Sequence, residues 1–277
     1  MIKIEKTEVM GWENAIRGMR NSHDSWDKSD SVWIEGPEAS SDEYIFVERA
    51  GEQGFWVGPA DQELMLRLSR AGSDHRKFMR MINVYMDITA PLYLYKELDT
   101  YAIGKVQNSC STMHSITKRE FTLEDFSHEH LDDESTDAML DLIALLNKWR
   151  DRYLVAVKTK EYTGMPAKDI WWQIIQLLPS SYNQRRTVML NYEVLRNIYH
   201  ARKNHKLDEW RIFCKWIEAL PFSELITGGN HPTITVNGKD VLMSVNAYCK
   251  LNGMPPVEDI PVIEKRNVTC KEENNNV

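Results

Sequence analysis

The chain has 277 residues, of which 42% are hydrophobic and 27% are charged, a composition typical of a globular protein with enough apolar residues for a core. The formal net charge of −7 argues against a broad nucleic-acid-binding surface, and no apolar run is long enough to span a membrane. The four cysteines form no CxxC pair, which disfavours a disulfide framework and a zinc site, and the N-terminus lacks the apolar stretch of a signal peptide. We therefore expect a cytoplasmic protein that binds neither nucleic acid nor membrane.

The first half of the chain predicts short helices and strands. Residues 12–22 have the spacing of a helix that buries Ile16 and Met19 and displays Arg17 and Arg20. A hairpin is expected from the strands 44–48 and 55–57. Two helices are expected after it, one over 61–71 that ends at Gly72 and a short one over 92–101. The clearest strand is 80–90, where apolar residues alternate with mostly polar ones before Pro91.

The second half predicts mainly helices. Apolar residues recur every three or four positions in four segments, which are 139–153, 167–178, 188–202 and 207–220. Asn237-Gly238 between β-branched residues predicts a hairpin over 233–241, and the tail 264–277 is expected to be disordered. The fold class is therefore α+β, with a mainly helical second half and a small antiparallel sheet, as one domain over 1–263.

Common metal and nucleotide motifs are absent. His128, Glu129 and His130 stand together, but their spacing matches no strong ligand motif, so we expect no metal site. Neither a G-x-G-x-x-G sequence nor a P-loop occurs.

Two segments carry candidate binding chemistry. Residues 99–114 contain many small polar and amide side chains and read either as a ligand-binding loop or as a polar turn without a ligand. Asn191 and Arg202 lie eleven residues apart, which is three turns plus roughly 20°, so we expect both side chains on one helix face. A buried guanidinium needs a partner, and a phosphate or carboxylate ligand fits its fork, whereas an acidic residue of the chain itself is the simpler structural alternative.

The motifs resemble those of the flavin-dependent thymidylate synthase family, in patches over residues 10–220. An early helix reads Ala15-Ile16-Arg17-x-x-Arg20-x-Ser22, and residues 72–91 are similar to the helix-turn-strand segment that leads to the family's signature helix. The most specific match is a spacing without gaps, and its members are Pro179, Asn191, Asn197 and Arg202, followed by Glu209-Trp210.

The resemblance implies roles for particular residues. Ser22, Asn191 and Asn197 would contact FAD, and Arg202 would bind the substrate nucleotide and act in catalysis. Substrate contacts in the signature loop would come from three residues, namely Asn108, Ser109 and Ser111, of which Ser111 would also be catalytic.

Several family arginines are missing from this chain. The basic RHR triplet falls on Tyr101-Ala102-Ile103, and other family arginines fall on Met113, Ile175 and Glu193. A signature glutamate is replaced by Ser109. Substitutes for the lost charges are sought among Lys96, Lys105 and His114.

The resemblance further implies methylation of dUMP to dTMP in a homotetramer, with reduced FAD supplying hydride and with methylenetetrahydrofolate and NADPH as co-substrates. Two alternatives stay open, which are a nucleotide- and flavin-binding relative that has lost catalysis and an enzyme for another pyrimidine nucleotide. Cys110 reads either as a covalent nucleophile or as an ordinary small loop residue.

Overall fold

A four-stranded antiparallel sheet forms the centre of the protein in the computed structural model, which describes residues 1–35, 46–50, 53–229, 233–236 and 239–242. Its strands follow the order β1-β5-β9-β6, and their bounds are Lys3–Met10, Asn83–Pro91, Asn183–Asn191 and Lys105–Ser109. The strand predicted over 80–90 is confirmed as β5. Its alternating residues Val84, Met86 and Ile88 are buried on one face, while Tyr85 on the other is 39% exposed.

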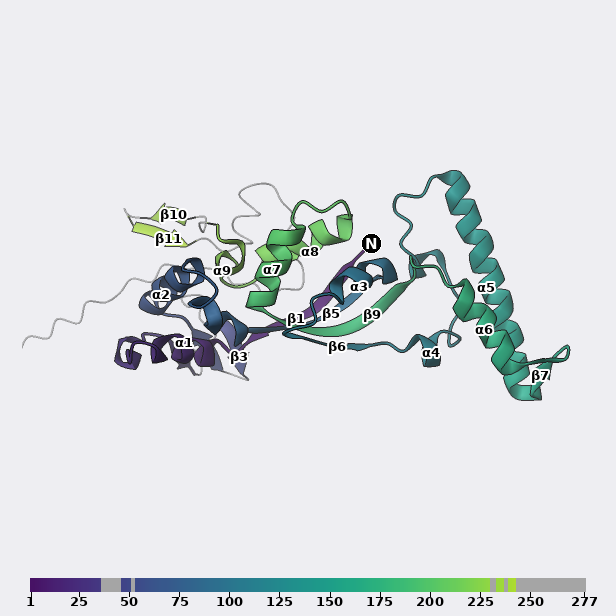
Figure 1. Ribbon diagram of the computed structural model, residues 1–277, viewed down its shortest axis with the longest axis horizontal. Coiled ribbons are helices and arrows are strands. Elements are labelled where there is room, and N and C mark those ends of the chain that lie inside the picture. Colours follow the sequence, from purple (N-terminus) through teal and green to yellow (C-terminus); the bar gives the residue numbers. More distant parts are fainter. Residues whose placement is uncertain (36–45, 51–52, 230–232, 237–238, 243–277) are drawn as a thin grey trace, which may run out of the picture.

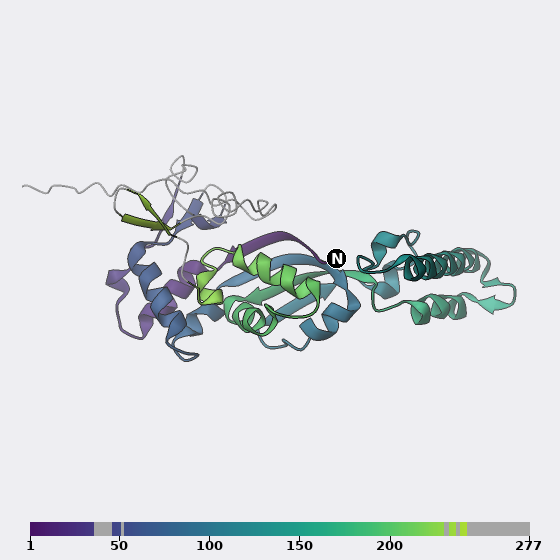
Figure 2. The ribbon, with the colours of Figure 1, turned by 90° about the horizontal axis from the view of Figure 1, so that it is seen from above.

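Helices cover one face of this sheet (Figures 1 and 2). They are α3 (Leu92–Leu98), α7 (Tyr192–Arg202) and α8 (Asp208–Glu218). Trp210 and Phe213 of α8 and Leu195 and Ile198 of α7 are buried in the main core with the apolar residues of β5 and β9. The sheet therefore supports α7, which carries Asn197 and Arg202 and has Asn191 as its N-cap.

A smaller layer lies at one end of the sheet (Figure 1). It contains α1 (Trp12–Asn21), α2 (Pro59–Arg70) and a three-stranded sheet of order β2-β4-β3, whose strands are Val32–Ile34, Gln53–Trp56 and Phe46–Ala50. Short helical turns complete it, namely η1 (Trp26–Lys28), η3 (Arg76–Arg80) and α9 (Glu224–Thr227). The predicted first helix, second helix and hairpin are thus present.

A helical arm projects from the opposite end (Figure 1). It consists of α5 (Asp133–Thr159) and α6 (Ala167–Leu177), joined by the two-stranded β7-β8 hairpin at Glu161–Tyr162 and Met165–Pro166. A second apolar cluster lies where the arm meets α4 (Thr112–Ser115) and η4 (Leu123–Asp125), and it includes Phe121, Phe126 and Leu146.

The expectation of a helix over 188–202 is wrong for its first four residues. These residues end β9, and α7 begins at Tyr192 with Asn191 as its N-cap. The apolar residues of this stretch suit both structures, and pairing with β5 and β6 on either side decides for the strand. The 99–114 segment likewise contains strand β6 at the sheet edge, although the sequence predicted a loop.

The C-terminal hairpin is confirmed at the level of the backbone. β10 (Thr233–Val236) pairs with β11 (Lys239–Leu242) in antiparallel register. The turn Asn237-Gly238 and the tail 264–277 lie outside the described residues, and the single domain over 1–263 stays a prediction.

The expectation that Arg20 is displayed on the surface is also wrong. Arg20 is buried, and its Nε atom lies 2.5 Å from Oδ1 of Asp61, which is fully buried in α2. The same carboxylate accepts hydrogen bonds from the hydroxyls of Ser29 and Ser31, each at 2.7 Å. This network fixes the 29–31 segment against α1 and α2.

Asp61→Ala should lower the free energy of unfolding by about 3–5 kcal/mol, because it leaves the Arg20 guanidinium buried without a counter-charge. Urea denaturation measures the change. Glu63→Ala, an exposed acid on the same helix, is the matched control and should change stability by less than about 0.5 kcal/mol. A loss at Asp61 no larger than that of the control would contradict the account.

The same network predicts acid sensitivity. Burial raises the pKa of Asp61, but hydrogen bonds from Ser29, Ser31 and Arg20 outweigh it, so the pKa lies below its ordinary value of 3.8. A depressed folded-state pKa stabilises the protein at higher pH, and this contribution is lost as the pH falls from 3.8 through the folded value. Asp61→Asn should therefore flatten the acid limb of the curve of stability against pH. An unchanged limb would count against the network.

Candidate functional site

The N-terminal end of α7 is closed by its own cap. The carbonyl oxygen of the Asn191 side chain accepts a hydrogen bond of 3.0 Å from the amide of Val194. The Asn191 side chain also touches the 101–104 segment, since a Cβ atom placed on Gly104 would lie 2.7 Å from its Nδ2. Gly104 has a φ of 77°, so its glycine serves both this close approach and a left-handed backbone.

The C-terminal end of α7 carries Arg202 in an acidic and aromatic setting. Its Nη1 atom lies 2.8 Å from Oε2 of Glu97, and its Nε donates to the hydroxyl of Tyr101 at 3.1 Å. The guanidinium also lies 5.1 Å from the ring centroid of Trp210, whose indole N–H donates to Glu97 at 2.9 Å. We call these residues, together with His205 beside Glu97, the Arg202 cluster.

Two kinds of partner were considered for Arg202, a bound anion and an acidic residue of the chain, and the structure shows the second kind. The acidic partner is present, and it is Glu97. The side chains of Arg202 and Glu97 remain 22% and 32% exposed, so the pair is open to solvent at the surface of α7 and α3. No sequence pattern pointed to Glu97, because an ion pair across more than a hundred residues leaves no local signal.

Asn191 and Arg202 do not form the single helix surface that the sequence predicted. They mark opposite ends of α7, about 16 Å apart for eleven residues at 1.5 Å each. Residues 101–104, where the family's basic triplet would stand, touch both ends through Tyr101 and Gly104. Asn197 lies between the ends and is exposed.

A second charged cluster surrounds Asp99 at the end of α3. Lys105 and Arg186 lie 2.7 Å and 3.1 Å from its carboxylate oxygens, and Gln107 donates to it at 2.8 Å. Burial raises the pKa of Asp99, but these donors hold it below its ordinary value. The Arg186 guanidinium stacks 3.8 Å from the ring centroid of Tyr95. Lys105, one of the substitute cations considered from the sequence, therefore forms an ion pair with Asp99. Arg186, which the sequence did not single out, pairs with the same carboxylate.

The signature-loop residues lie farther along the sheet edge. Lys105 pairs with Leu190, next to Asn191, whereas Ser109 pairs with Arg186. Four residues of β6 at about 3.3 Å each therefore place Ser109 roughly 13 Å along the strand from Lys105, the β6 residue nearest to Asn191. Asn108, Ser109 and the following Ser111 are exposed. In the described part of the chain, no hydrogen bond or ion pair joins these three residues to Asn191, Asn197 or Arg202.

The remaining candidates are Ser111, Cys110 and two possible substitute cations, Lys96 and His114. Ser111 precedes α4, and its backbone oxygen accepts from the hydroxyl of Ser115. The exposed Cys110 lies 3.4 Å from the same hydroxyl. Lys96 and His114 are exposed.

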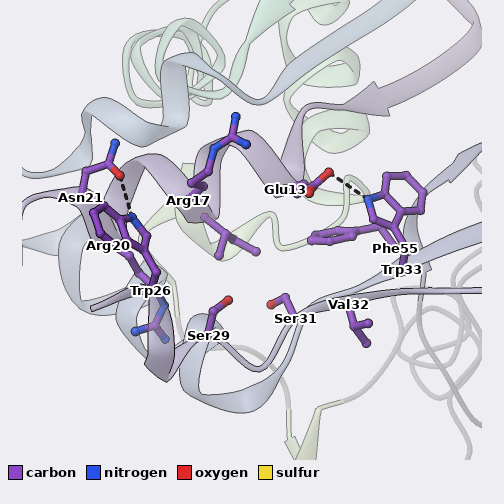
Figure 3. Close-up of a pocket in the computed structure, with 11 residues that line it drawn as sticks. Glu13, Arg17, Arg20, Asn21, Trp26, Ser29, Ser31, Val32, Trp33 and Phe55 are labelled. Atoms are coloured by element: carbon purple, nitrogen blue, oxygen red, sulfur yellow. Dashed lines mark hydrogen bonds between the residues drawn. The ribbon is translucent and has the colours of Figure 1, made fainter. Parts of the chain in front are cut away.

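Ser22 and a separate cavity both belong to the α1 layer. Ser22 is exposed at the end of α1, and its hydroxyl donates to the carbonyl of Met19 at 3.3 Å. A cavity of about 580 Å³ lies between α1, residues 26–31 and strands β2 and β4 (Figure 3). None of the site residues expected from the sequence lines it.

Among the described residues, no group of three or more His, Cys, Asp or Glu side chains is placed to hold a metal ion. His128 bonds instead to the carbonyl of Phe126, and His130 to Asp208. The same part of the chain contains no helix that combines the length and apolarity needed to cross a membrane.

Comparison with known proteins shows similarity in three dimensions. No protein-family profile and no curated protein sequence matches the chain. Two solved structures of thymidylate synthase X, a flavin-dependent thymidylate synthase from Helicobacter pylori, with FAD and dUMP are similar at TM-scores of 0.56 and 0.55. In both, the identity is 16%, and the match covers 82% of this chain and 98% of the solved one. The chain therefore has an α+β fold like that of this enzyme.

The coupling between Arg202 and Glu97 can be measured by a double-mutant cycle. Arg202→Met and Glu97→Gln, alone and combined, should reveal a coupling of about 1–2 kcal/mol in urea denaturation, because the pair is partly shielded from water. The exposed pair Lys77–Asp74 is the control and should show no more than about 0.5 kcal/mol. Equal couplings for both pairs would contradict the geometry described for α7.

Proposed function

We propose that the chain is a divergent flavin-dependent thymidylate synthase, in which Arg202 binds a dUMP-like pyrimidine nucleotide. The observation that carries this proposal is the position of Arg202, which ends a helix packed on a sheet whose fold is similar to enzymes crystallised with FAD and dUMP. Its guanidinium is stacked near Trp210 and partly open to solvent, so a phosphate could reach its remaining N–H donors.

Two of the three residues assigned to FAD fit that role. Ser22 and Asn197 are exposed and present a hydroxyl and an amide that a ligand can reach. Asn191 fits in part, since its carbonyl oxygen is committed to capping α7 while its amide nitrogen faces Gly104. In such an enzyme reduced FAD would supply the hydride, while methylenetetrahydrofolate would supply the carbon and NADPH the reducing equivalents.

The role of this chain's own residues is binding and orientation. Arg202 would hold the anionic end of the nucleotide, and Trp210 would keep the guanidinium plane fixed. Asn108, Ser109 and Ser111 are exposed on one chain, so they would join a shared site only if a neighbouring subunit approached them. A homo-oligomer, by analogy a tetramer, is therefore part of this proposal.

A specific observation favours a second function, which is ligand binding without turnover. Glu97 already neutralises Arg202, and Tyr101, Ala102 and Ile103 supply no cation where the family has its triplet. Glu193 replaces a further arginine and pairs with Arg76 at 3.0 Å. A chain with this charge distribution could keep a nucleotide and a flavin in place while having lost the charges that catalysis needs.

Binding and turnover can be separated on the purified protein. We expect a flavin absorbance spectrum and a dUMP-dependent stabilisation of about 2.7 kcal/mol when the nucleotide is a hundredfold above its Kd. Conversion of dUMP to dTMP with methylenetetrahydrofolate and NADPH, and rescue of a thymidine-requiring host, then report turnover. Arg202→Ala should abolish dUMP binding and rescue, whereas Arg211→Ala, an exposed arginine on α8 paired with Asp208, should not.

Each outcome assigns a function. Binding with turnover supports the enzyme, and binding without turnover supports the second function. Absence of both flavin and dUMP binding would overturn both, and full activity of Arg202→Ala would remove Arg202 from the site.

Glu97→Gln provides a sharper test of the role of Arg202. Loss of the competing carboxylate should tighten dUMP binding about tenfold, equivalent to about 1.4 kcal/mol, because the phosphate no longer displaces an internal anion. Isothermal titration calorimetry measures the affinity, and Glu218→Gln at the exposed end of α8 serves as the control. Weaker binding to Glu97→Gln would show that the carboxylate itself contacts the ligand.

A further inference from the structure

The cavity beside α1 faces away from the side of the helix that carries Ser22. Glu13 lines the cavity, and Ser22 follows nine residues later, which is about 180° around a helix. Gly18, one turn before Ser22, instead faces Met81, whose sulfur would lie 3.1 Å from an added Cβ. The cavity is therefore separate from the flavin contact proposed for Ser22 and from the Arg202 cluster.

Aromatic rings form two walls of the cavity (Figure 3). Trp26 lies on one side of the cavity, and Trp33 and Phe55 lie on the other. The ring centroids of Trp33 and Phe55 are 5.1 Å apart. Both indole N–H groups are occupied, since Trp26 donates to Asn21 at 2.7 Å and Trp33 donates to Glu13 at 3.0 Å. These bonds fix the rings and leave their faces for contact with a ligand.

The floor of the cavity is rigid. Ser29 and Ser31 line it between the two aromatic walls, and both hydroxyls are tied to the buried carboxylate of Asp61. Trp26 nevertheless stays 52% exposed above this floor. A preformed cavity of about 580 Å³ with an open indole has the size and lining of a small-molecule site.

The charges around the cavity indicate the chemistry of its ligand. Arg20 is neutralised by Asp61, but Arg17 has only the uncharged side-chain oxygen of Asn14 as a hydrogen-bond partner, at 2.7 Å. No carboxylate in the described part of the chain forms an ion pair with Arg17. Glu13 uses Oε2 for the indole of Trp33, so its other oxygen can accept from a ligand N–H.

We propose that this cavity is a second ligand site, for a planar heteroaromatic ring that bears an N–H donor and a negatively charged group. The ring would stack on the face of Trp33, the donor would bond to Glu13 beside it, and Arg17, one helical turn along α1, would hold the anion. An adenine mononucleotide is the simplest probe with all three features.

The probes are AMP, adenosine, which lacks the charge, and ribose 5-phosphate, which lacks the ring. Isothermal titration calorimetry on the full chain should show AMP binding at least about tenfold more tightly than either of the others. Arg17→Ala should reduce the affinity for AMP to that for adenosine, and Trp33→Leu, which removes the flat indole, should weaken AMP and adenosine alike. Arg67→Ala, an exposed arginine on α2 outside the cavity, should change nothing.

Two results would overturn the proposal. They are no AMP binding at concentrations of about 1 mM, and AMP binding that Arg17→Ala and Trp33→Leu leave unchanged. Because AMP and dUMP are titrated separately, failure here leaves the proposed function untouched, and the converse also holds.

Discussion

Four ion pairs between buried or partly buried guanidinium groups and carboxylates organise the protein. Arg20 has Asp61, Arg186 has Asp99, Arg76 has Glu193 and Arg202 has Glu97. Each pair joins elements that are distant in the chain, so the charges hold the layers in register as well as satisfying one another. Arg202 differs from Arg20 because its pair lies near the surface, where an outside anion can compete with Glu97.

Local sequence patterns were sufficient to predict those helices and strands whose type does not depend on pairing with distant segments. Alternation identified β5, and three-four spacing identified α5 and α6. The β10–β11 hairpin followed from the Asn-Gly turn signal. The patterns failed for β9 because residues 188–191 have apolar residues compatible with both a helix and a strand. Pairing with β5 and β6 decides that case, and such pairing cannot be read from the segment alone.

The sequence named candidate site residues, but it could not predict how the structure arranges them. The spacing of Asn191, Asn197 and Arg202 predicted one helix surface, whereas Asn191 caps α7 and Arg202 ends it. Glu97, Asp99 and Arg186 were missed because each acts through a partner far away in sequence. Arg20 was misplaced for the same reason, since helical periodicity cannot reveal Asp61 in another helix.

Under the proposed function, nucleotide binding and internal ion pairing compete for the guanidinium of Arg202. A crystal structure of the chain with dUMP tests this claim most directly. The account predicts the nucleotide phosphate within hydrogen-bond distance of Arg202, with Glu97 turned away from it. A nucleotide bound elsewhere, with the Arg202–Glu97 pair intact, would contradict it.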